Sequence, residues 1–236
     1  MTLDEKEAVI SLHKVVKSYG SAEATTYALR GVNLEIKRGE FVAIMGPSGS
    51  GKSTAMNIIG CLDTLSSGDY LFGGVDIQKL SLDQRTLLRR NYIGFIFQGF
   101  NLLGKTTAIE NVELPLLYRG FPARQRSEMA MNALRSVGLE QVAHHTPAEL
   151  SGGQQQRVAI ARAIVTDPFI LLADEPTGNL DTAKSREIME LLSSFNKEKG
   201  LTIVMVTHEN EMASYASRII RFRDGKIDDT LHVEKA

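Results

Sequence analysis

The sequence has 236 residues, of which 43% are apolar and 23% charged, and this length fits one large α/β domain or a core with a smaller appendage. Its formal net charge of −1 gives no reason to expect a polyanionic partner such as nucleic acid. The single cysteine, Cys61, excludes an intramolecular disulfide and a cysteine-rich metal site, and it is typical of a reducing compartment.

The N-terminal part of the sequence predicts strands and no targeting segment. The first residues, MTLDEKEAVI, are acidic and lack an apolar core, so we expect no signal peptide. Residues 10–19 and 28–36 alternate apolar and polar side chains, which predicts half-exposed, antiparallel strands. Because every apolar run is far shorter than the ~20 residues that span a bilayer, we expect a soluble protein that meets a membrane only through another chain.

Four short, continuously apolar segments predict buried strands of a parallel sheet covered on both faces. They are residues 41–45, 93–97, 169–173 and 202–207. The first runs into a glycine-rich loop, after which apolar residues at helical spacing predict a helix beginning near Lys52. Near the C-terminus, Asp224-Gly225 between two alternating runs predicts a β-hairpin.

The segment between these strands has a helical pattern. Met129, Ala133 and Val137 lie on one stripe, and Gly138 is placed to end the helix. We expect a helical subdomain over about residues 100–160, inserted into a core made of about 1–99 and 161–236. The predicted fold is therefore α/β, with a mainly parallel central sheet, an N-terminal antiparallel β-subdomain and an inserted helical subdomain, and the motif described next makes its core that of a P-loop NTPase.

Residues 46–53, GPSGSGKS, fit the phosphate-binding pattern G-x-x-x-x-G-K-[ST] between a strand and a helix, and we call them the phosphate loop. Its glycines let backbone N–H groups surround phosphate oxygens at a helix N-terminus, where the helix dipole favours anions. We predict that Lys52 reaches the β- and γ-phosphates of ATP, that Ser53 binds Mg²⁺ and that Thr54 contacts the α-phosphate. The predicted nucleotide-binding residues here are Gly46, Pro47, Ser48, Gly49, Ser50, Gly51, Lys52, Ser53 and Thr54.

Polar residues follow the other three predicted strands, and ligands of open α/β sheets bind at that edge. Asp174 ends a buried strand, where its carboxylate needs a partner that Mg²⁺ held with Ser53 supplies. Glu175 points elsewhere because successive side chains alternate, and we assign it as the general base that polarises the attacking water, with a cap or salt bridge as the alternative. Gln98 and His208 are predicted to contact the γ-phosphate and the water or Mg²⁺. The predicted metal ligands are Ser53, Gln98 and Asp174.

Together with FQ at 97–98, LSGGQQQR from Leu150, ILLADEPT, NLD and THE, these motifs resemble those of an ABC-type ATPase over nearly the whole chain. The phrases NIIGCLD, IGFIFQGFNLL, ENVELPL and DEPTGNLD are similar to a narrower branch. That branch contains ATPases of macrolide exporters, of lipoprotein-release machines and of a cell-division system. The resemblance implies that residues 1–236 form a single nucleotide-binding domain that hydrolyses ATP.

The resemblance also implies a role for residues 150–154, LSGGQ, which we call the second glycine loop. In this family two copies pack head to tail, so that this loop of one copy faces the phosphate loop of the other. Ser151, Gly152, Gly153 and Gln154 would then contact ATP held by the partner, and Asp181 would touch the opposite subunit. A glycine turn that caps a helix is the alternative for this loop.

Two further expectations concern single residues. By resemblance Tyr19 stacks on adenine, with Tyr27 as the competing candidate and a plain strand aromatic as the alternative. Arg85, Arg89 and Arg90 are expected to form a solvated face, with contact to a membrane subunit or to lipid headgroups as the alternative.

The favoured function is an ATPase that drives a separate integral membrane permease from the cytoplasmic face of the inner membrane, in export or lipoprotein release. Its expected partners are a second copy of itself, the permease and a periplasmic adaptor, with no nucleic acid. A cell-division ATPase is the alternative. A DNA-maintenance ATPase is disfavoured because such proteins insert a coiled coil or zinc-binding cysteines between the two glycine loops. A regulator without hydrolysis is disfavoured by the presence of Glu175 and His208.

Overall fold

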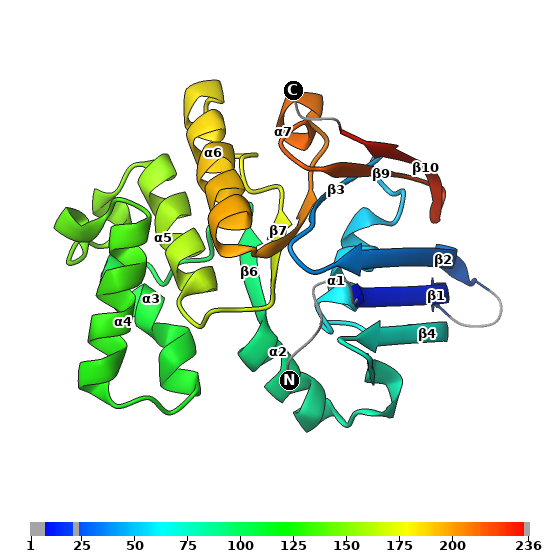
Figure 1. Cartoon of the computed structure of the whole chain (residues 1–236), viewed down its shortest axis with the longest axis horizontal. Helices are drawn as coiled ribbons and strands as arrows, with labels where there is room; N and C mark the ends of the chain where they lie inside the picture. Colours follow the sequence, from blue (N-terminus) through cyan, green and yellow to red (C-terminus); the bar gives the residue numbers. More distant parts are fainter. Residues whose placement is uncertain (1–7, 21–23, 234–236) are drawn as a thin grey trace.

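The computed structural model describes residues 8–20 and 24–233 (Figure 1). Residues 1–7, on which the expectation of no signal peptide mainly rests, lie outside the described part. None of the described helices is long and apolar enough to cross a membrane.

The central sheet has six strands in the order β10-β9-β3-β8-β7-β6. Its strands are β3 (Phe41–Met45), β6 (Ile93–Phe97), β7 (Ile170–Asp174), β8 (Thr202–Val206), β9 (Arg218–Arg223) and β10 (Lys226–His232). All neighbours pair in parallel except β10, which pairs antiparallel with β9 through the predicted hairpin. The four predicted parallel strands are therefore adjacent, and their carboxyl ends share one edge.

A second, antiparallel sheet has the order β2-β1-β4-β5. Its strands are β1 (Ala8–Tyr19), β2 (Thr26–Lys37), β4 (Ser67–Phe72) and β5 (Val75–Asp76). The first two confirm the alternating segments of the sequence, whereas β4 and β5 were not predicted. Figure 1 shows this sheet beside the central one, with α1 (Lys52–Ile59) between them.

Three helices, α3 (Ala108–Tyr118), α4 (Ala123–Ser136) and α5 (Gly152–Ile164), lie together on the left of Figure 1. They occupy the predicted helical region, although α5 continues past residue 160 because its apolar stripe extends to Ala163. The other helices are α2 (Leu82–Tyr92), α6 (Thr182–Lys199) and α7 (Asn210–Ala213).

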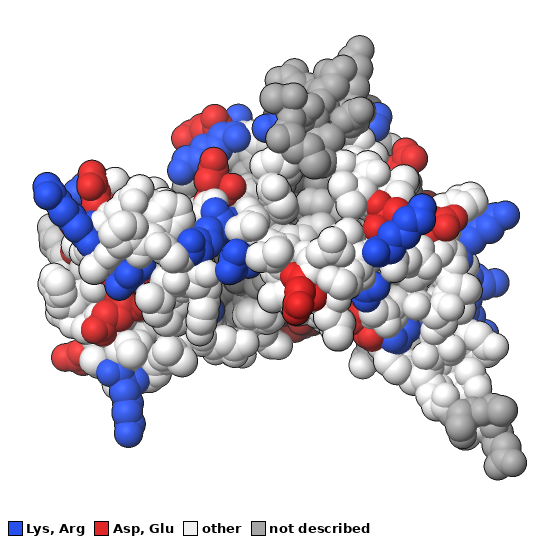
Figure 2. Space-filling model, turned by 90° about the horizontal axis from the view of Figure 1, so that it is seen from below, with Lys and Arg blue, Asp and Glu red and all other residues white. Residues whose placement is uncertain are grey.

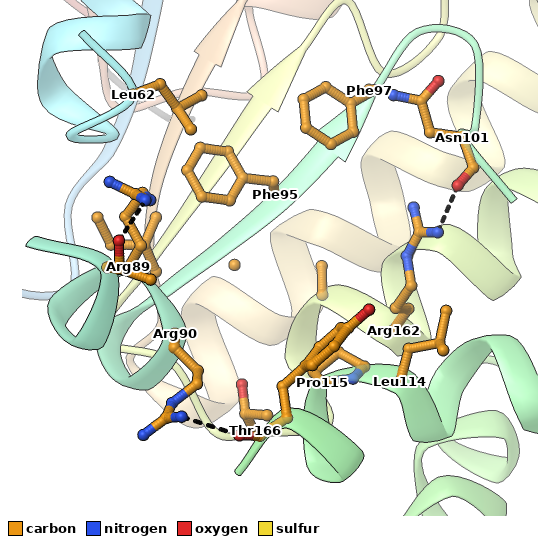
Figure 3. Close-up of a pocket in the computed structure, with 15 residues that line it drawn as sticks. Leu62, Arg89, Arg90, Phe95, Phe97, Asn101, Leu114, Pro115, Arg162 and Thr166 are labelled. Carbon is orange, nitrogen blue, oxygen red and sulfur yellow. Dashed lines mark hydrogen bonds between the residues drawn. The ribbon is translucent and has the colours of Figure 1, made fainter. Parts of the chain in front are cut away.

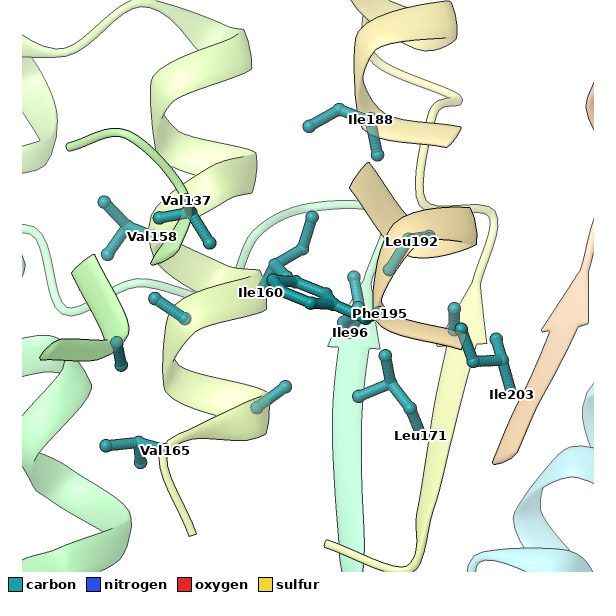
Figure 4. Close-up of a cluster of buried hydrophobic side chains, with 14 of the residues drawn as sticks. Ile96, Val137, Val158, Ile160, Val165, Leu171, Ile188, Leu192, Phe195 and Ile203 are labelled. Atoms are coloured by element: carbon teal, nitrogen blue, oxygen red, sulfur yellow. The ribbon is translucent and has the colours of Figure 1, made fainter. Parts of the chain in front are cut away.

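Strand β3 shows why continuously apolar segments became buried strands. Phe41, Ala43 and Met45 belong to the hydrophobic core that includes α5 and α6, whereas Val42 and Ile44 belong to the core around α1 and the antiparallel sheet. Both faces of the central sheet are therefore covered. Figure 4 shows the first core, where Ile160 of α5 and Leu192 and Phe195 of α6 pack over Ile96 and Leu171.

Candidate functional site

The phosphate loop joins the carboxyl end of β3 to the start of α1, and its shape depends on glycine. Gly46, Gly49 and Gly51 have φ angles of 152°, 75° and 103°. A Cβ added to Gly46 would lie 2.3 Å from the carbonyl oxygen of Phe222, and one added to Gly51 would lie 2.5 Å from that of Ala28. These two positions exclude a side chain both by their backbone conformation and by close approach.

Helix α1 begins at Lys52 with no side-chain cap and no acidic residue in its first turn. Its first N–H groups therefore stay available to an anion, which the helix dipole also favours. The ammonium of Lys52 is drawn into the loop, where it donates to the carbonyl oxygens of Gly46 and Pro47 at 2.8 Å each.

A cavity of about 450 Å³ opens over this loop, and we call it the phosphate-loop cavity. Its lining comprises Ala28, Gly46, Pro47, Ser48, Gly49, Gly51, Lys52, Ser53, Thr54, Glu175, Val206 and His208. The structure therefore brings Glu175 and His208, which end two other strands, to the phosphate loop, as the sequence predicted. Ser50 lies beneath the surface, and within the described residues its buried Oγ has no hydrogen-bond partner.

Glu175 is held by its backbone and by its side chain. Its N–H donates to the carbonyl of Val206 at 2.9 Å, and its φ of 45° turns the chain sharply after β7. Its Oε1 lies 3.0 Å from Nδ1 of His208. The carboxylate is thereby fixed at the edge of the cavity with a ring nitrogen beside it.

Asp174 is half-buried and lies at the end of β7, directly before Glu175. Burial raises the pKa of the Asp174 carboxyl, the negative charge of Glu175 raises it further, and the ammonium of Lys52 lowers it. The Lys52 ammonium thus only partly offsets burial and the charge of Glu175, and a divalent cation beside Asp174 would offset them further. The described residues contain no cluster of three or more His, Cys, Asp or Glu side chains able to hold a metal. A Mg²⁺ ion here would use Ser53, Asp174 and phosphate oxygens, a donor set that Mg²⁺ prefers.

Gln98 follows β6 but does not line the phosphate-loop cavity. Its side chain packs against Gly178, where an added Cβ would lie 2.6 Å from Nε2, and its carbonyl accepts a bond of 2.9 Å from Nδ2 of Asn179. The structure therefore places Gln98 against the loop before α6. Its predicted contact with γ-phosphate or metal stays a prediction.

Tyr19 lies near the start of α1 and is held by partners that the sequence did not suggest. Its Oη donates to Asp63 at 2.8 Å, and the ammonium of Lys17, which also bonds Asp63 at 2.7 Å, lies 4.7 Å from the ring centroid. Burial and then the bond to Asp63 raise the pKa of the Tyr19 phenol, while the hydroxyl of Thr54 lowers it. Tyr19 and Tyr27 are 45% and 51% exposed, so exposure does not separate the two candidates, and the stacking of Tyr19 on adenine stays a prediction.

None of the four predicted residues of the second glycine loop lines the phosphate-loop cavity. Ser151 caps α5: its Oγ accepts from the N–H of Gln154 at 3.3 Å, and Oε1 of Gln154 accepts from the N–H of Ser151 at 2.9 Å. Ser151 is exposed, Gly152 half-buried and Gly153 buried. Asp181 similarly caps α6, accepting from the N–H of Lys184 at 2.9 Å. The structure thus confirms that this loop caps a helix, and the capping residue Ser151 lies at the surface.

A second cavity, of about 580 Å³, lies between α2, β6, α3 and α5 (Figure 3), and we call it the groove. It is lined by Leu62, Thr86, Arg89, Arg90, Ile93, Gly94, Phe95, Phe97, Asn101, Leu114, Pro115, Tyr118, Arg162, Ala163 and Thr166. The expectation of a solvated face holds for Arg90, which is exposed although it donates to the carbonyl of Tyr118 at 2.9 Å. It is wrong for the half-buried Arg85 and Arg89, which donate to the carbonyls of Ile77 at 3.2 Å and Cys61 at 2.7 Å. Such bonds depend on tertiary packing, which sequence spacing does not show.

Residues 29–178, more than half of the chain, match the family model of the ABC transporter. The chain belongs to the ABC transporter family. The uncharacterised ABC transporter ATP-binding protein MJ0796 of Methanocaldococcus jannaschii is 50% identical to this ABC transporter chain. The match covers 93% of this chain and 95% of MJ0796. A dimeric, post-hydrolysis structure of MJ0796 bound to ADP and Pi has a TM-score of 0.87 and 46% identity, with 96% of this chain and 100% of that chain covered.

A longer relative is the macrolide export ATP-binding/permease protein MacB of Vibrio parahaemolyticus, which is 48% identical over 97% of this chain. The match covers 35% of MacB, so this ABC transporter chain spans about a third of the length of that relative.

The groove and the Lys17–Asp63 anchor of Tyr19 are features that sequence reasoning missed. In the structure Phe95 and Phe97 of β6 are half-buried where they line the groove, and no periodicity or motif in the sequence marks it.

Proposed function

We propose that this chain is the ATP-binding and ATP-hydrolysing subunit of an ABC transporter and that two copies work head to tail. The observation that carries the proposal is the division of the site. The phosphate loop, Glu175 and His208 line one cavity, whereas Ser151–Gln154 lie outside it, and Ser151, the N-cap of α5, is exposed. A relative half identical to this chain is dimeric with ADP and Pi bound, which supports the same arrangement here.

In this proposal the phosphate loop binds the triphosphate through its backbone N–H groups and the start of α1. Lys52 turns from the carbonyls of Gly46 and Pro47 toward the β- and γ-phosphates, and Thr54 contacts the α-phosphate. Ser53 and Asp174 hold Mg²⁺, which neutralises charge on the phosphates. Tyr19, anchored by Asp63, stacks on adenine.

Hydrolysis needs a base at the γ-phosphate, and Glu175 fits that role. Its carboxylate accepts a proton from the attacking water, while His208 fixes its orientation through the 3.0 Å contact. We propose that Gln98 contacts the γ-phosphate and the metal once MgATP is bound. It would have to leave its present packing against Gly178 to do so.

The second copy completes the site. The hydroxyl of Ser151 and the N–H groups of Gly152 and Gly153 would bind the γ-phosphate of ATP held by the partner, with Gln154 beside them and Asp181 at the interface. The N-terminus of α5 adds a favourable dipole toward this anion. ATP then holds the two copies together, and hydrolysis releases them.

We also propose that a cytoplasmic segment of a membrane permease fills the groove. MacB is an ATP-binding/permease protein of which this chain spans about a third, so the permease part would come from another chain or segment. Exposed Leu62, Leu103, Leu117 and Tyr118 lie in or near the elements that form the groove. Figure 2 shows the molecule from below, where basic and acidic side chains lie scattered among uncharged ones, with both kinds near the middle. The chain would thus work on the cytoplasmic face of the inner membrane in export or lipoprotein release, with a periplasmic adaptor beyond the permease.

A mixing experiment tests the shared site. Lys52→Met removes the phosphate-loop cation and Ser151→Arg blocks the second glycine loop, so each variant alone should be inactive. In a heterodimer of the two, one site combines an intact phosphate loop with an intact second glycine loop. Random pairing at equal amounts should therefore restore about a quarter of the parent ATPase rate, when the two sites act independently. A fully active single variant would contradict the head-to-tail arrangement. So would the absence of restored activity, provided that mixtures of the parent with Lys52→Met show that one intact site turns over beside an inactive one.

A further inference from the structure

The turn that follows Gln98 has an unusual backbone. Phe100 and Asn101 have φ angles of 61° and 50°, and no glycine occupies either position. A left-handed conformation is costly for a bulky residue such as phenylalanine, so surrounding contacts must hold it. Within the turn, the N–H groups of Phe100 and Asn101 donate to the carbonyls of Phe97 at 3.1 Å and Gly99 at 2.6 Å.

Arg162 of α5 holds this turn from outside. Its Nη1 donates to the carbonyl of Asn101 at 2.6 Å and its Nη2 to that of Phe100 at 2.8 Å. Burial lowers the pKa of the Arg162 guanidinium, and Arg162 takes part in none of the ion pairs found in the described part of the chain. The half-buried guanidinium of Arg162 thus has no carboxylate partner among the described residues and donates to two neutral carbonyls of one turn.

The same turn also reaches the second glycine loop. A Cβ added to Gly152 would lie 3.9 Å from Cζ of Phe100. Arg162 lies ten residues further along α5, about 15 Å away at 1.5 Å per residue, so the turn is bonded near the end of the helix and lies close to its start. Only Gly99 separates Gln98 from Phe100, so the contacts that hold the turn also limit where Gln98 can lie.

We propose that Arg162 is a positioning residue that clamps the Phe100–Asn101 turn to α5 and so fixes Gln98 relative to the second glycine loop. The inference rests on the proposed two-copy function, because the second glycine loop acts on the partner's nucleotide. Asn101 and Arg162 also line the groove, where Figure 3 shows the bond between them. A segment that fills the groove therefore contacts the clamp directly.

The test compares Arg162→Met, Arg162→Lys and Arg119→Met in the Glu175→Gln chain. Arg119 is the matched control: it is also a half-buried arginine that donates to backbone carbonyls, those of Arg90, Asn91 and Thr166, and it is not bonded to the turn. Hydrogen exchange in peptides covering residues 99–102 reports the clamp in the nucleotide-free chain. Sedimentation with MgATP gives the dimer dissociation constant, and titration of dilute protein gives the affinity of the single chain for MgATP.

For Arg162→Met we expect exchange of residues 99–102 to speed up about tenfold and the dimer dissociation constant to rise about tenfold, the scale of losing bonds from a charged donor. The affinity of the single chain for MgATP should stay within about twofold, because Arg162 does not line the phosphate-loop cavity. Arg162→Lys should recover part of both losses, and Arg119→Met should match the parent in both.

Unchanged exchange in Arg162→Met would overturn the proposal, as would an equal loss of dimer in Arg119→Met, which would mark a general packing effect. If the Glu175→Gln parent itself forms no dimer with MgATP, the proposed two-copy function fails. The exchange comparison of nucleotide-free chains then still decides whether the clamp exists.

Discussion

Replacing Glu175 by glutamine distinguishes the two roles that the geometry of Glu175 allows, general base and partner of His208. Gln keeps the size of the side chain, and its amide oxygen still accepts a hydrogen bond from Nδ1 of His208 across the 3.0 Å contact. The backbone bond from Glu175 to Val206 is unaffected. The substitution therefore removes the negative charge and the ability to take a proton, and little else.

The expected size of the effect differs strongly between the two roles. As a general base, Glu175 should contribute about 10²- to 10⁴-fold to the rate, or about 2.7–5.5 kcal/mol at 1.36 kcal/mol per factor of ten. As a partner of His208 alone, whose side chain is 61% exposed, it would contribute an ion pair of about 0–1 kcal/mol, or less than about fivefold. A loss of 100-fold or more therefore identifies the base.

The charge change also acts on Asp174. Burial and then Glu175 raise the pKa of Asp174, so the folded chain binds this proton more tightly than the unfolded chain does. Its unfolding free energy therefore falls as pH rises through the range between the ordinary and the raised pKa. Glu175→Gln should lower that pKa, reduce this loss of stability and leave MgATP binding at least as tight as in the parent.

Phosphate release measures the rate, and a sizing column in MgATP measures the dimer, which should accumulate when hydrolysis stalls. Glu187→Gln is the matched control, because Glu187 also forms ion pairs, with Lys184 and Arg157, but does not line the phosphate-loop cavity. Hydrolysis by Glu175→Gln within fivefold of the Glu187→Gln rate would refute the assignment of the base.

Further substitutions test the other parts of the site. Gly46→Ala should destabilise the fold by about 3 kcal/mol or more and abolish ATP binding, whereas Gly49→Ala, whose added Cβ meets nothing within 4 Å, should cost about 1–2 kcal/mol in urea unfolding. Equal costs would show that close approach is not what the loop requires. Tyr19→Ala should weaken ATP binding by about 1–3 kcal/mol in calorimetry and Tyr27→Ala by much less, and the reverse order would make Tyr27 the stacking residue. Ser151→Arg should cost about 1 kcal/mol of stability through the lost cap and keep ATP binding by the single chain, while light scattering shows no dimer. Loss of ATP binding by the single chain would contradict the proposal that the second glycine loop acts on the ATP of the partner.

The sequence predicted those elements whose burial follows from a pattern of neighbouring residues. The segments 41–45 and 93–97 were found with the bounds of β3 and β6, since burial on both faces requires an unbroken apolar run. What it did not predict depends on residues far apart in the chain. The anchor of Tyr19 by Asp63 joins positions 44 apart, and the bond of Arg162 to Asn101 joins positions 61 apart. No period or motif links such positions, so only the folded structure reveals them.

The phosphate loop itself is held by tertiary contacts that its pattern does not contain. The N–H of Gly225, in the hairpin turn before β10, donates to the carbonyl of Ser50 at 3.0 Å, and the carbonyl of Gly225 accepts from the N–H of Arg30 in β2 at 2.8 Å. A Cβ on Gly225 would lie 2.8 Å from the carbonyl of Ala28, so this turn is wedged between the loop and the antiparallel sheet. The hairpin that the sequence predicted only as a chain reversal therefore connects the antiparallel sheet to the anion-binding loop. Because Tyr19 lies in that same sheet, the turn also ties the sheet that carries the proposed stacking residue to the phosphate loop.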